Sequence, residues 1–372
     1  MTSADKLGII VAVAVVVIFV GIGVGMSGVS EPVKVTHPVS DRPDVQQQGV
    51  APRDMGSSTE VVKSDLSKPP GPSVLEICGD GMDNNGNGII DEAPTPPRPG
   101  VDWSECDLTD MDLRGADLYN ADLRDADLRD ANLRDADLRK TDLSDADLGH
   151  ADLHGADLRG ADLTRTAMYA ADFRGADLRG ADMSKTLYRA WFNGADLRGA
   201  NFANDDGSWN YDSNSYYEKA DLRNANFYHV DHTNSNFLGA DLSEADLRKS
   251  DFNRANFYNA KLIGADLSDA ILIETNFVNA NLYDARLSWA DLSEAYLSES
   301  DLSETNLRNA KLIGADLYKA NLTGADLNRA NLTGADLRYA DLTGADLTDA
   351  ILTHDSDLTG ADLSCYNHSI CD

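Results

Sequence analysis

The sequence predicts an all-β protein, a four-sided parallel β-helix that follows one membrane-spanning helix and a disordered linker. Three observations support this prediction. A five-residue pattern, A-[DN]-[LF]-x-x, repeats almost without a break over residues 106–363. Residues 7–26 form an uncharged and almost wholly apolar run. Four cysteines stand near the two ends of the repeat region.

The period of the repeat decides the fold class. A period of five fits neither a helix, with 3.6 residues per turn, nor a strand, which alternates every two residues. The chain is therefore expected to turn a corner after each repeat, with one large residue (Leu118) and one small residue (Ala116) pointing inward. Four corners close a coil of about twenty residues, and coils stack about 4.8 Å apart. This stacking predicts an internal ladder of Phe237, Phe257 and Phe277.

The repeats also carry a family resemblance. The segments GADLRGADL at 155–163 and GADLNRANLTGADL at 324–337 resemble pentapeptide repeat proteins. The resemblance extends over residues 106–363 and implies a right-handed quadrilateral β-helix, whose handedness the corner argument alone does not give. Because the family includes proteins that protect DNA gyrase from quinolones, the resemblance makes an acidic mimic of DNA one candidate function.

The repeat has irregularities. Leu187 follows Met183 after four positions instead of five, which predicts a kink or bulge. Residues 203–219 either complete a coil with poor inward residues or loop out, and inserted loops of repeat proteins often carry binding sites. The candidate binding loop and its surroundings comprise Trp191, Asp205, Asp206, Trp209, Tyr211, Asp212, Tyr216 and Tyr217. The alternative is that these rings only fill a weak coil.

The N-terminal region predicts a membrane attachment. After a short tail of residues 1–6, residues 7–28 are expected to form a single-pass transmembrane anchor, because about twenty helical residues rise about 30 Å. A signal peptide, whose cleavage would leave a secreted protein, is the alternative. Residues 29–77 are rich in Pro, Ser, Val and Gln, have no sustained apolar period and predict a disordered linker.

Residues 78–100 combine an Asp/Asn-rich loop with a proline-rich spacer. Alternating oxygen-bearing residues in one tight loop suit Ca²⁺, which takes six to eight oxygen ligands. The stretch 80–92 resembles the calcium loops of thrombospondin type 3 and dockerin-type repeats, although Pro94 stands where a full EF-hand has its closing Glu. A weak Ca²⁺ site is therefore predicted, with the ligands Asp83, Asn85, Asn87, Ile89, Asp91 and Glu92. A turn without an ion is the alternative.

The cysteines indicate the compartment. Cys78 and Cys106 bracket the calcium-like loop, and Cys365 and Cys371 lie in the segment 364–372, which is expected to cap the column. An even count at two ends suggests two local disulfides, and the spacing of a zinc site is absent. Disulfides persist in oxidising compartments, which places the repeat domain, residues 101–363, outside the cytoplasm.

The pattern of charged residues indicates which kinds of partner the protein could bind. The chain has 63 acidic and 32 basic residues, for a net charge of −31. Most aspartates precede the central Leu, where a short carboxylate can accept a hydrogen bond from a nearby backbone N–H. Arginines such as Arg124 and Arg129 alternate with aspartates in the early coils, so their surface is mixed in sign. No nucleic-acid partner is expected, and no catalytic motif is present, which predicts a protein that is not an enzyme.

These observations favour a membrane-anchored, extracytoplasmic solenoid that serves as a structural or protein-interaction module. One alternative is a cytoplasmic-facing acidic DNA mimic with a gyrase-like partner. Another is a glycan-binding surface protein that works through Trp209 and Tyr211. The expected partner is thus an unidentified protein or glycan. The chain could also form a homodimer through the ends of the rod or through the membrane helix.

Overall fold

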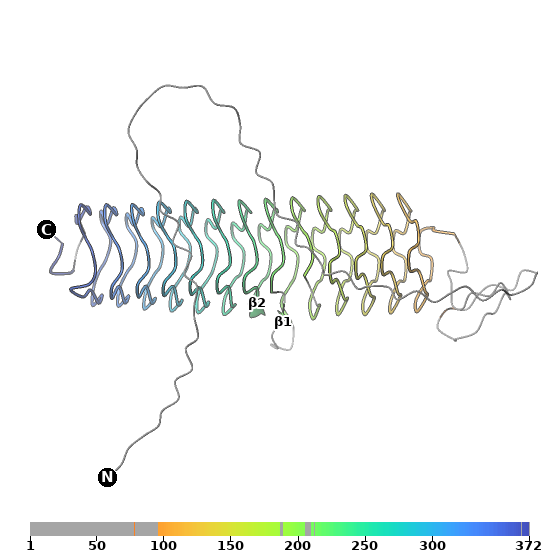
Figure 1. The fold of residues 1–372 in the computed structure, drawn as a ribbon, viewed down its shortest axis with the longest axis horizontal. Coiled ribbons are helices and arrows are strands. Elements are labelled where there is room, and N and C mark those ends of the chain that lie inside the picture. The colour runs from red at the N-terminus through yellow and green to blue at the C-terminus, as the bar shows by residue number, and fades with distance from the viewer. Residues whose placement is uncertain are drawn as a thin grey trace, which may run out of the picture. The chain divides into compact units, whose positions relative to one another are not determined.

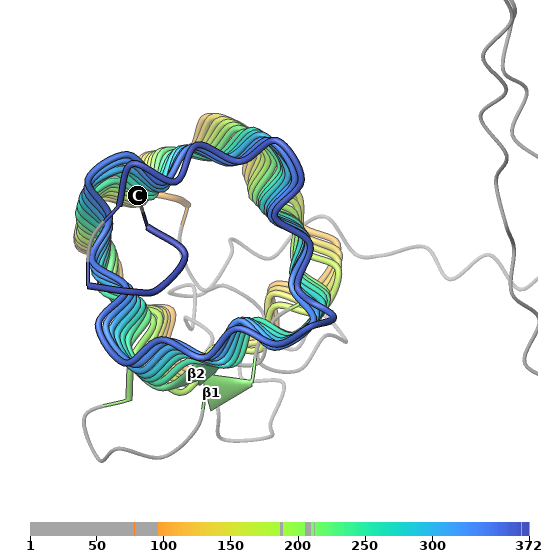
Figure 2. The same ribbon diagram turned by 90° about the vertical axis from the view of Figure 1, so that its left-hand side faces the viewer.

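The computed structural model describes Cys78 and residues 96–186, 189–204, 210–211, 213–365 and 367–371. These residues belong to one compact unit, Pro69–Asp372. Its coils follow one another along a single axis (Figure 1), and a view along that axis shows four sides joined by rounded corners (Figure 2). Within the described part of the chain, no helix is both long and apolar enough to cross a membrane. The predicted anchor, 7–28, and linker, 29–77, lie outside the described residues.

Each side of a coil pairs with the same side of the next coil. In the first coil Asp102 pairs with Asp122 and Asp107 with Asp127, both in parallel, so coils stack at the predicted period of twenty residues. Most sides contribute a single bridging residue because the chain turns immediately afterwards. Two-residue strands occur where β1 (Asn210–Tyr211) runs parallel to β2 (Val230–Asp231).

The corners explain the composition of the repeat. At one corner the Ala126 N–H donates to the Leu123 carbonyl at 3.2 Å, and Asp125 between them has a φ of 57°. A positive φ at the third residue of a turn is the geometry of type II turns, which Gly, Asn and Asp tolerate best. The carboxylate of Asp122 accepts a hydrogen bond from the Arg124 N–H at 3.2 Å. The interpretation of the aspartates as turn-forming residues is therefore confirmed.

The core is a narrow column of the central and small residues. Leu118 and Leu123 are fully buried, and Phe237, Phe257 and Phe277 form the predicted ladder. Their ring centroids lie 4.7 and 5.0 Å apart, with interplanar angles of 7° and 8°. The ladder also continues toward the N-terminus through three further stacked rings, at centroid spacings of 4.7, 5.1 and 5.0 Å: Tyr217, Phe192 and Phe173.

Two successive coils in the middle of the column depart from the period of twenty, and a third departs near the C-terminal end, where Asp336 pairs with Asp357, twenty-one positions on. Asp172 pairs with Trp191, nineteen positions on, and Trp191 pairs with Tyr216, twenty-five positions on. One coil is thus one residue short and the next has five residues to spare. The spare residues favour the loop over a complete regular coil for the segment 203–219. Leu187, where a kink or bulge was predicted, lies outside the described residues.

Candidate functional site

The two irregular coils in the middle of the column depart from the repeat on the same side of the solenoid. Its bridging residues in the described chain include Ala167, Tyr211, Asp231 and Asp251, and we call this side the slip face. The missing residue falls between Asp182 and Trp191, and the extra five fall between Asn201 and Tyr211. Each of these passages crosses the slip face. The other three sides keep their pairing through both coils.

The opposite side, which we call the ladder face, stays regular through the same coils. Its bridging residues are Asp137, Asp157, Asp177, Asp196 and Asp221, each followed two positions later by an arginine: Arg139, Arg159, Arg179, Arg198 and Arg223. Each of these arginines lies 2.5–2.6 Å from its own aspartate. The first four also lie 3.5–3.7 Å from the aspartate of the next coil. The ion-pair ladder therefore crosses both irregular coils without a gap.

The arginines also set the protonation of this face. The Arg198 guanidinium donates to Asp196 and holds the pKa of that carboxyl below its usual value, and Arg223 has the same effect on the pKa of Asp221. These carboxylates consequently stay ionised and are compensated at neutral pH. A negative charge that is already neutralised by a neighbouring arginine presents little free charge to a partner.

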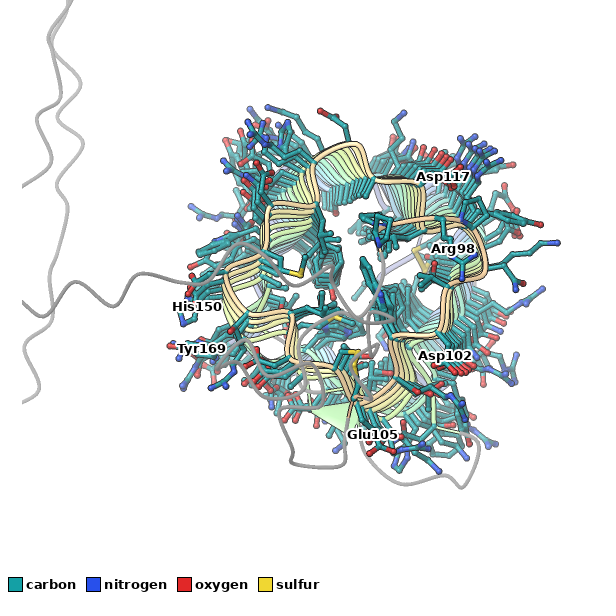
Figure 3. The ribbon with its side chains drawn as sticks, turned by 90° about the vertical axis from the view of Figure 1, so that its right-hand side faces the viewer. Arg98, Asp102, Glu105, Asp117, His150 and Tyr169 are labelled. Atoms are coloured by element: carbon teal, nitrogen blue, oxygen red, sulfur yellow. A yellow bond between two sulfur atoms is a disulfide. The ribbon has the colours of Figure 1, made fainter. Side chains whose placement is uncertain are left out.

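Exposed aromatic side chains gather beside the slip face. Trp191 and Tyr216 form a β-bridge on the adjacent side. Trp191 exposes 39% of its surface to solvent and Tyr216 exposes 44%. At the corner between the two sides, Tyr169 is 54% exposed and packs edge-on against His150, with ring centroids 5.5 Å apart. Figure 3 shows His150 and Tyr169 together on the outside of the coils. Three aromatic residues thus line one corner of the irregular coils.

The predicted binding residues divide into four groups. Trp191 and Tyr216 are at the surface, as a binding role requires. Tyr217 must be removed from the candidate site, because it is fully buried and stacks between Phe192 and Phe237 in the core ladder. Tyr211 lies in β1. The remaining candidates lie outside the described residues: Asp205, Asp206, Trp209 and Asp212.

Two hollows open on either side of Trp191. One, of about 340 Å³, is lined by His150, Tyr169, Ala170, Arg189, Trp191, Asn214 and Tyr216. The other, of about 460 Å³, is lined by Asp172, Arg174, Trp191 and Asn193. We call the two together the Trp191 groove. Its lining combines ring faces with amide, imidazole and guanidinium donors, which is the usual composition of a site for a small polar ligand.

Arg189, which the sequence did not single out, is the unusual residue of this groove. Its φ is 125°, whereas every other positive φ of a non-glycine residue in the described chain lies between 54° and 68°. Its guanidinium carbon lies 6.0 Å from the centre of the Tyr169 ring. Among the described residues, no carboxylate lies within ion-pair distance of it. The four-residue step from Met183 to Leu187 was the sequence signal that something differs here.

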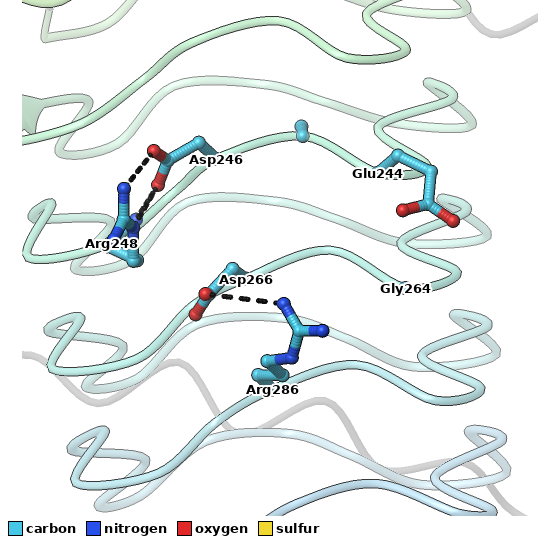
Figure 4. A pocket seen from close by; sticks show the side chains of 7 residues that line it. Glu244, Asp246, Arg248, Gly264, Asp266 and Arg286 are labelled. Atoms are coloured by element: carbon cyan, nitrogen blue, oxygen red, sulfur yellow. Dashed lines mark hydrogen bonds and ion pairs between the residues drawn. The ribbon is translucent and has the colours of Figure 1, made fainter.

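A third hollow, on regular coils, has a different character. It measures about 330 Å³ and is lined by Glu244, Ala245, Asp246, Arg248, Gly264, Asp266 and Arg286. Figure 4 shows its arginines engaged, Arg248 with Asp246 at 2.6 Å and Arg286 with Asp266 at 3.8 Å. It contains no aromatic ring. Both arginines of this hollow already have carboxylate partners within the fold.

The cysteines lie at the two ends of the column. The structure joins Cys78 to Cys106 and Cys365 to Cys371, with Cα–Cα distances of 4.7 and 4.9 Å. Cys106 is fully buried, while Cys78, Cys365 and Cys371 pack against the core as partly buried residues. The first bond ties Cys78 to the first coil, and the second closes a short segment at the C-terminal end of the column.

The predicted calcium ligands, Asp83 to Glu92, lie outside the described residues. Within the part of the chain that is described, no group of three or more His, Cys, Asp and Glu side chains could hold a metal ion. His232 is fully buried and stacks on Phe252 at 5.5 Å. It therefore acts as a core ring of the irregular coils.

No curated protein matches the chain. Among solved structures, a pentapeptide repeat protein from the thylakoid lumen of Arabidopsis thaliana is 31% identical, over 32% of this chain and 71% of that one, with a TM-score of 0.24. HetL, a pentapeptide repeat protein involved in heterocyst differentiation regulation from the cyanobacterium Nostoc, is 31% identical, over 71% and 88%, with a TM-score of 0.21. QnrB1, a plasmid-mediated fluoroquinolone resistance protein, is 20% identical, over 59% and 92%, with a TM-score of 0.28.

The family model for pentapeptide repeats matches more than half of the chain. It is found in eight copies, at residues 100–130, 126–165, 146–184, 220–257, 250–288, 290–329, 315–353 and 325–364. The largest gap in these matches, between residues 184 and 220, coincides with most of the two irregular passages across the slip face. The chain belongs to the pentapeptide repeat family, and its coils form the right-handed quadrilateral β-helix of that family.

Proposed function

We propose that the protein is a non-enzymatic interaction module that binds its partner at the Trp191 groove. One observation carries this proposal. The repeat breaks on one side only, and there the described surface combines exposed rings with an arginine that no described carboxylate pairs. The coils elsewhere also expose single rings, such as Trp289 and Tyr339, but they pair many of their charges. Exposed aromatics and arginine at a hollow are the residues that dominate binding energies at interfaces.

We further propose that residues 7–28 anchor the module in a membrane and that the coils lie on the extracytoplasmic side. The two disulfides support this location because such bonds persist in oxidising compartments. Digestion of intact cells with an added protease should remove the repeat domain while a cytoplasmic marker survives. Protection of the domain until the cells are lysed would overturn the external location.

The calcium loop remains part of the proposal. Binding of Ca²⁺ at Asp83 to Glu92 would be weak, in the range of extracellular modules, because two of the ligands are neutral Asn residues. Calorimetric titration of the full chain with CaCl₂ should give a binding signal that Asp83→Ala together with Asp91→Ala removes. An unchanged signal in that variant would place the calcium elsewhere, and no signal in the native chain would remove the site.

The ladder face gives little support to the alternative of an acidic DNA mimic, because its aspartates are paired with arginines over five coils. A gyrase supercoiling assay with excess protein tests it directly. Inhibition or protection of gyrase would favour the mimic over the groove. Association of two copies through the rod ends or through residues 7–28 is a separate expectation, which sedimentation of the full chain in detergent would measure.

A further inference from the structure

The Trp191 groove excludes one common mode of partner binding. A peptide can add itself to a sheet only where backbone groups are unpaired. Here the Trp191 N–H donates to the Ala171 carbonyl at 3.0 Å, and the Trp191 carbonyl accepts from the Phe173 N–H at 2.8 Å. The Tyr216 backbone is occupied in the same way by Ala190 and Phe192. A peptide therefore cannot pair as a strand with the backbone of Trp191 or Tyr216, and these two residues can contact a ligand only through their side chains.

The side chains suit a ring that has one apolar face and a polar rim. Trp191 and Tyr216 come from bridging positions of neighbouring coils, which stack about 4.8 Å apart. Asn193 and Asn214 line the two hollows beside them and offer amide donors and acceptors. Sugar rings present C–H groups on a face and hydroxyl groups at the edge. Hollows of about 340 and 460 Å³ leave room for one ring on each side of Trp191.

The charge of the groove indicates which kind of sugar it would bind. The chain carries a net charge of −31, yet the 340 Å³ hollow has Arg189 and no described carboxylate in its lining. Arg174 in the other hollow is held by Asp172 at 2.5 Å. Arg189 also has a backbone conformation that is rare for side chains with a Cβ, and such strain is concentrated at functional sites. A guanidinium is the preferred partner of a carboxylate, to which it donates two parallel hydrogen bonds.

We propose that the Trp191 groove binds an oligosaccharide that carries carboxylate groups. Trp191 and Tyr216 stack on the faces of its sugar rings, and Arg189 binds a ring carboxylate. This inference rests on the proposed interaction function and specifies its ligand.

Calorimetry on the full chain in detergent tests the proposal. The probes are tetragalacturonate, a glucuronate-containing tetrasaccharide, and the carboxyl-reduced, neutral form of each. At least one charged probe should bind about tenfold or more tighter than its neutral form, since a charge-assisted hydrogen bond is lost on reduction. Arg189→Gln should remove that preference and leave the weak binding of the neutral form unchanged. Trp191→Ala should remove binding of both forms.

Matched variants on regular coils control for general effects. Trp289→Ala removes a tryptophan that is 63% exposed, and Arg329→Gln removes an arginine whose side chain is 65% exposed. Both should bind like the native protein, and circular dichroism should be unchanged in all four variants. Absence of binding of both charged probes, equal binding of charged and neutral forms, or equal losses in the control variants would overturn the proposal. Capture of a protein partner through the groove with no sugar binding would overturn the ligand class and leave the interaction function intact.

Discussion

The slip face and the ladder face belong to the same coils and respond differently to the same change in chain length. Across the coils that are one residue short and five residues long, the ladder face keeps its Arg–Asp contacts at 3.5 Å, for Arg179 with Asp196 and for Arg198 with Asp221. The slip face takes up both changes. An unusual φ at Arg189 and a groove lined by exposed rings accompany them.

The difference shows how a repeat fold can acquire a site. Each side of a coil is held by its own contacts along the axis, so an irregular passage on one side leaves the pairing of the others intact. Inside, the ladder of rings from Phe173 to Phe277 runs through the irregular coils with spacings of 4.7–5.1 Å. The stacked rings keep the column filled where the chain outside departs from the repeat.

The largest effect is expected when that ladder is broken. Phe237→Ala should lower the free energy of unfolding by about 3–5 kcal/mol, because it opens a cavity and removes two stacked partners, Tyr217 and Phe257. Phe237→Leu should cost about 1–3 kcal/mol for the stacking alone. Denaturant titration followed by circular dichroism measures both. Leu317→Ala, at the corresponding position of a regular coil, is the control. A cost for Phe237→Ala that does not exceed the control would contradict the role of the rings.

Acid should unfold the protein through the ladder face. Arginine contacts lower the pKa of Asp196 and Asp221 in the fold, so these pairs stabilise it fully above the usual pKa of aspartate. That contribution is lost as the pH falls through the lowered values. Arg179→Gln combined with Arg198→Gln should therefore move the midpoint of acid unfolding to higher pH, measured by circular dichroism. Arg329→Gln, whose ion pair is widely exposed, should leave the midpoint almost unchanged.

Deletion of the extra residues on the slip face should change the stability of the protein only slightly. Deletion of residues 205–209 makes Tyr216 follow Trp191 after twenty residues instead of twenty-five. The free energy of unfolding should change by about 1 kcal/mol or less, because the cost of loop closure depends only weakly on length. Deletion of three residues, 205–207, should be tolerated equally well if the segment is a loop. Unfolding by the three-residue deletion alone would mean that the segment forms part of the coil.

The smallest change in stability is expected when single aspartates on the two faces are replaced. Burial, with Asp231 nearby, raises the pKa of Asp251 on the slip face, so its charge opposes folding as the pH rises through the raised value. Asp251→Asn should stabilise the protein slightly at pH 7, with no gain below the usual pKa of aspartate. Asp196→Asn on the ladder face should destabilise it at pH 7, because its pKa is lowered. Thermal unfolding at the two pH values gives both signs, and equal signs would contradict the assignment.

The sequence predicted part of the candidate site. Trp191 and Tyr216 belong to the candidate binding loop and its surroundings because they are aromatic residues near the interrupted repeats. The broken pattern hides the register of Tyr217, and only the twenty-five-residue pairing shows that it takes the inward place of a central Leu, as the alternative of rings that fill a weak coil requires. The sequence does not point to Arg189, because many residue types occupy the turn positions of the repeat. Its exposure and its distance from Tyr169 follow from how the short coil packs.

The period, the inward residues and the stacking of Phe237, Phe257 and Phe277 can be read from the amino-acid sequence, because they depend on contacts that repeat every twenty residues. The folded coils were needed to show that the two central irregularities fall on one side and that the opposite side remains an unbroken ion-pair ladder. An insertion or deletion changes the length of the chain locally, whereas the pairing of whole coils determines which side accommodates the change.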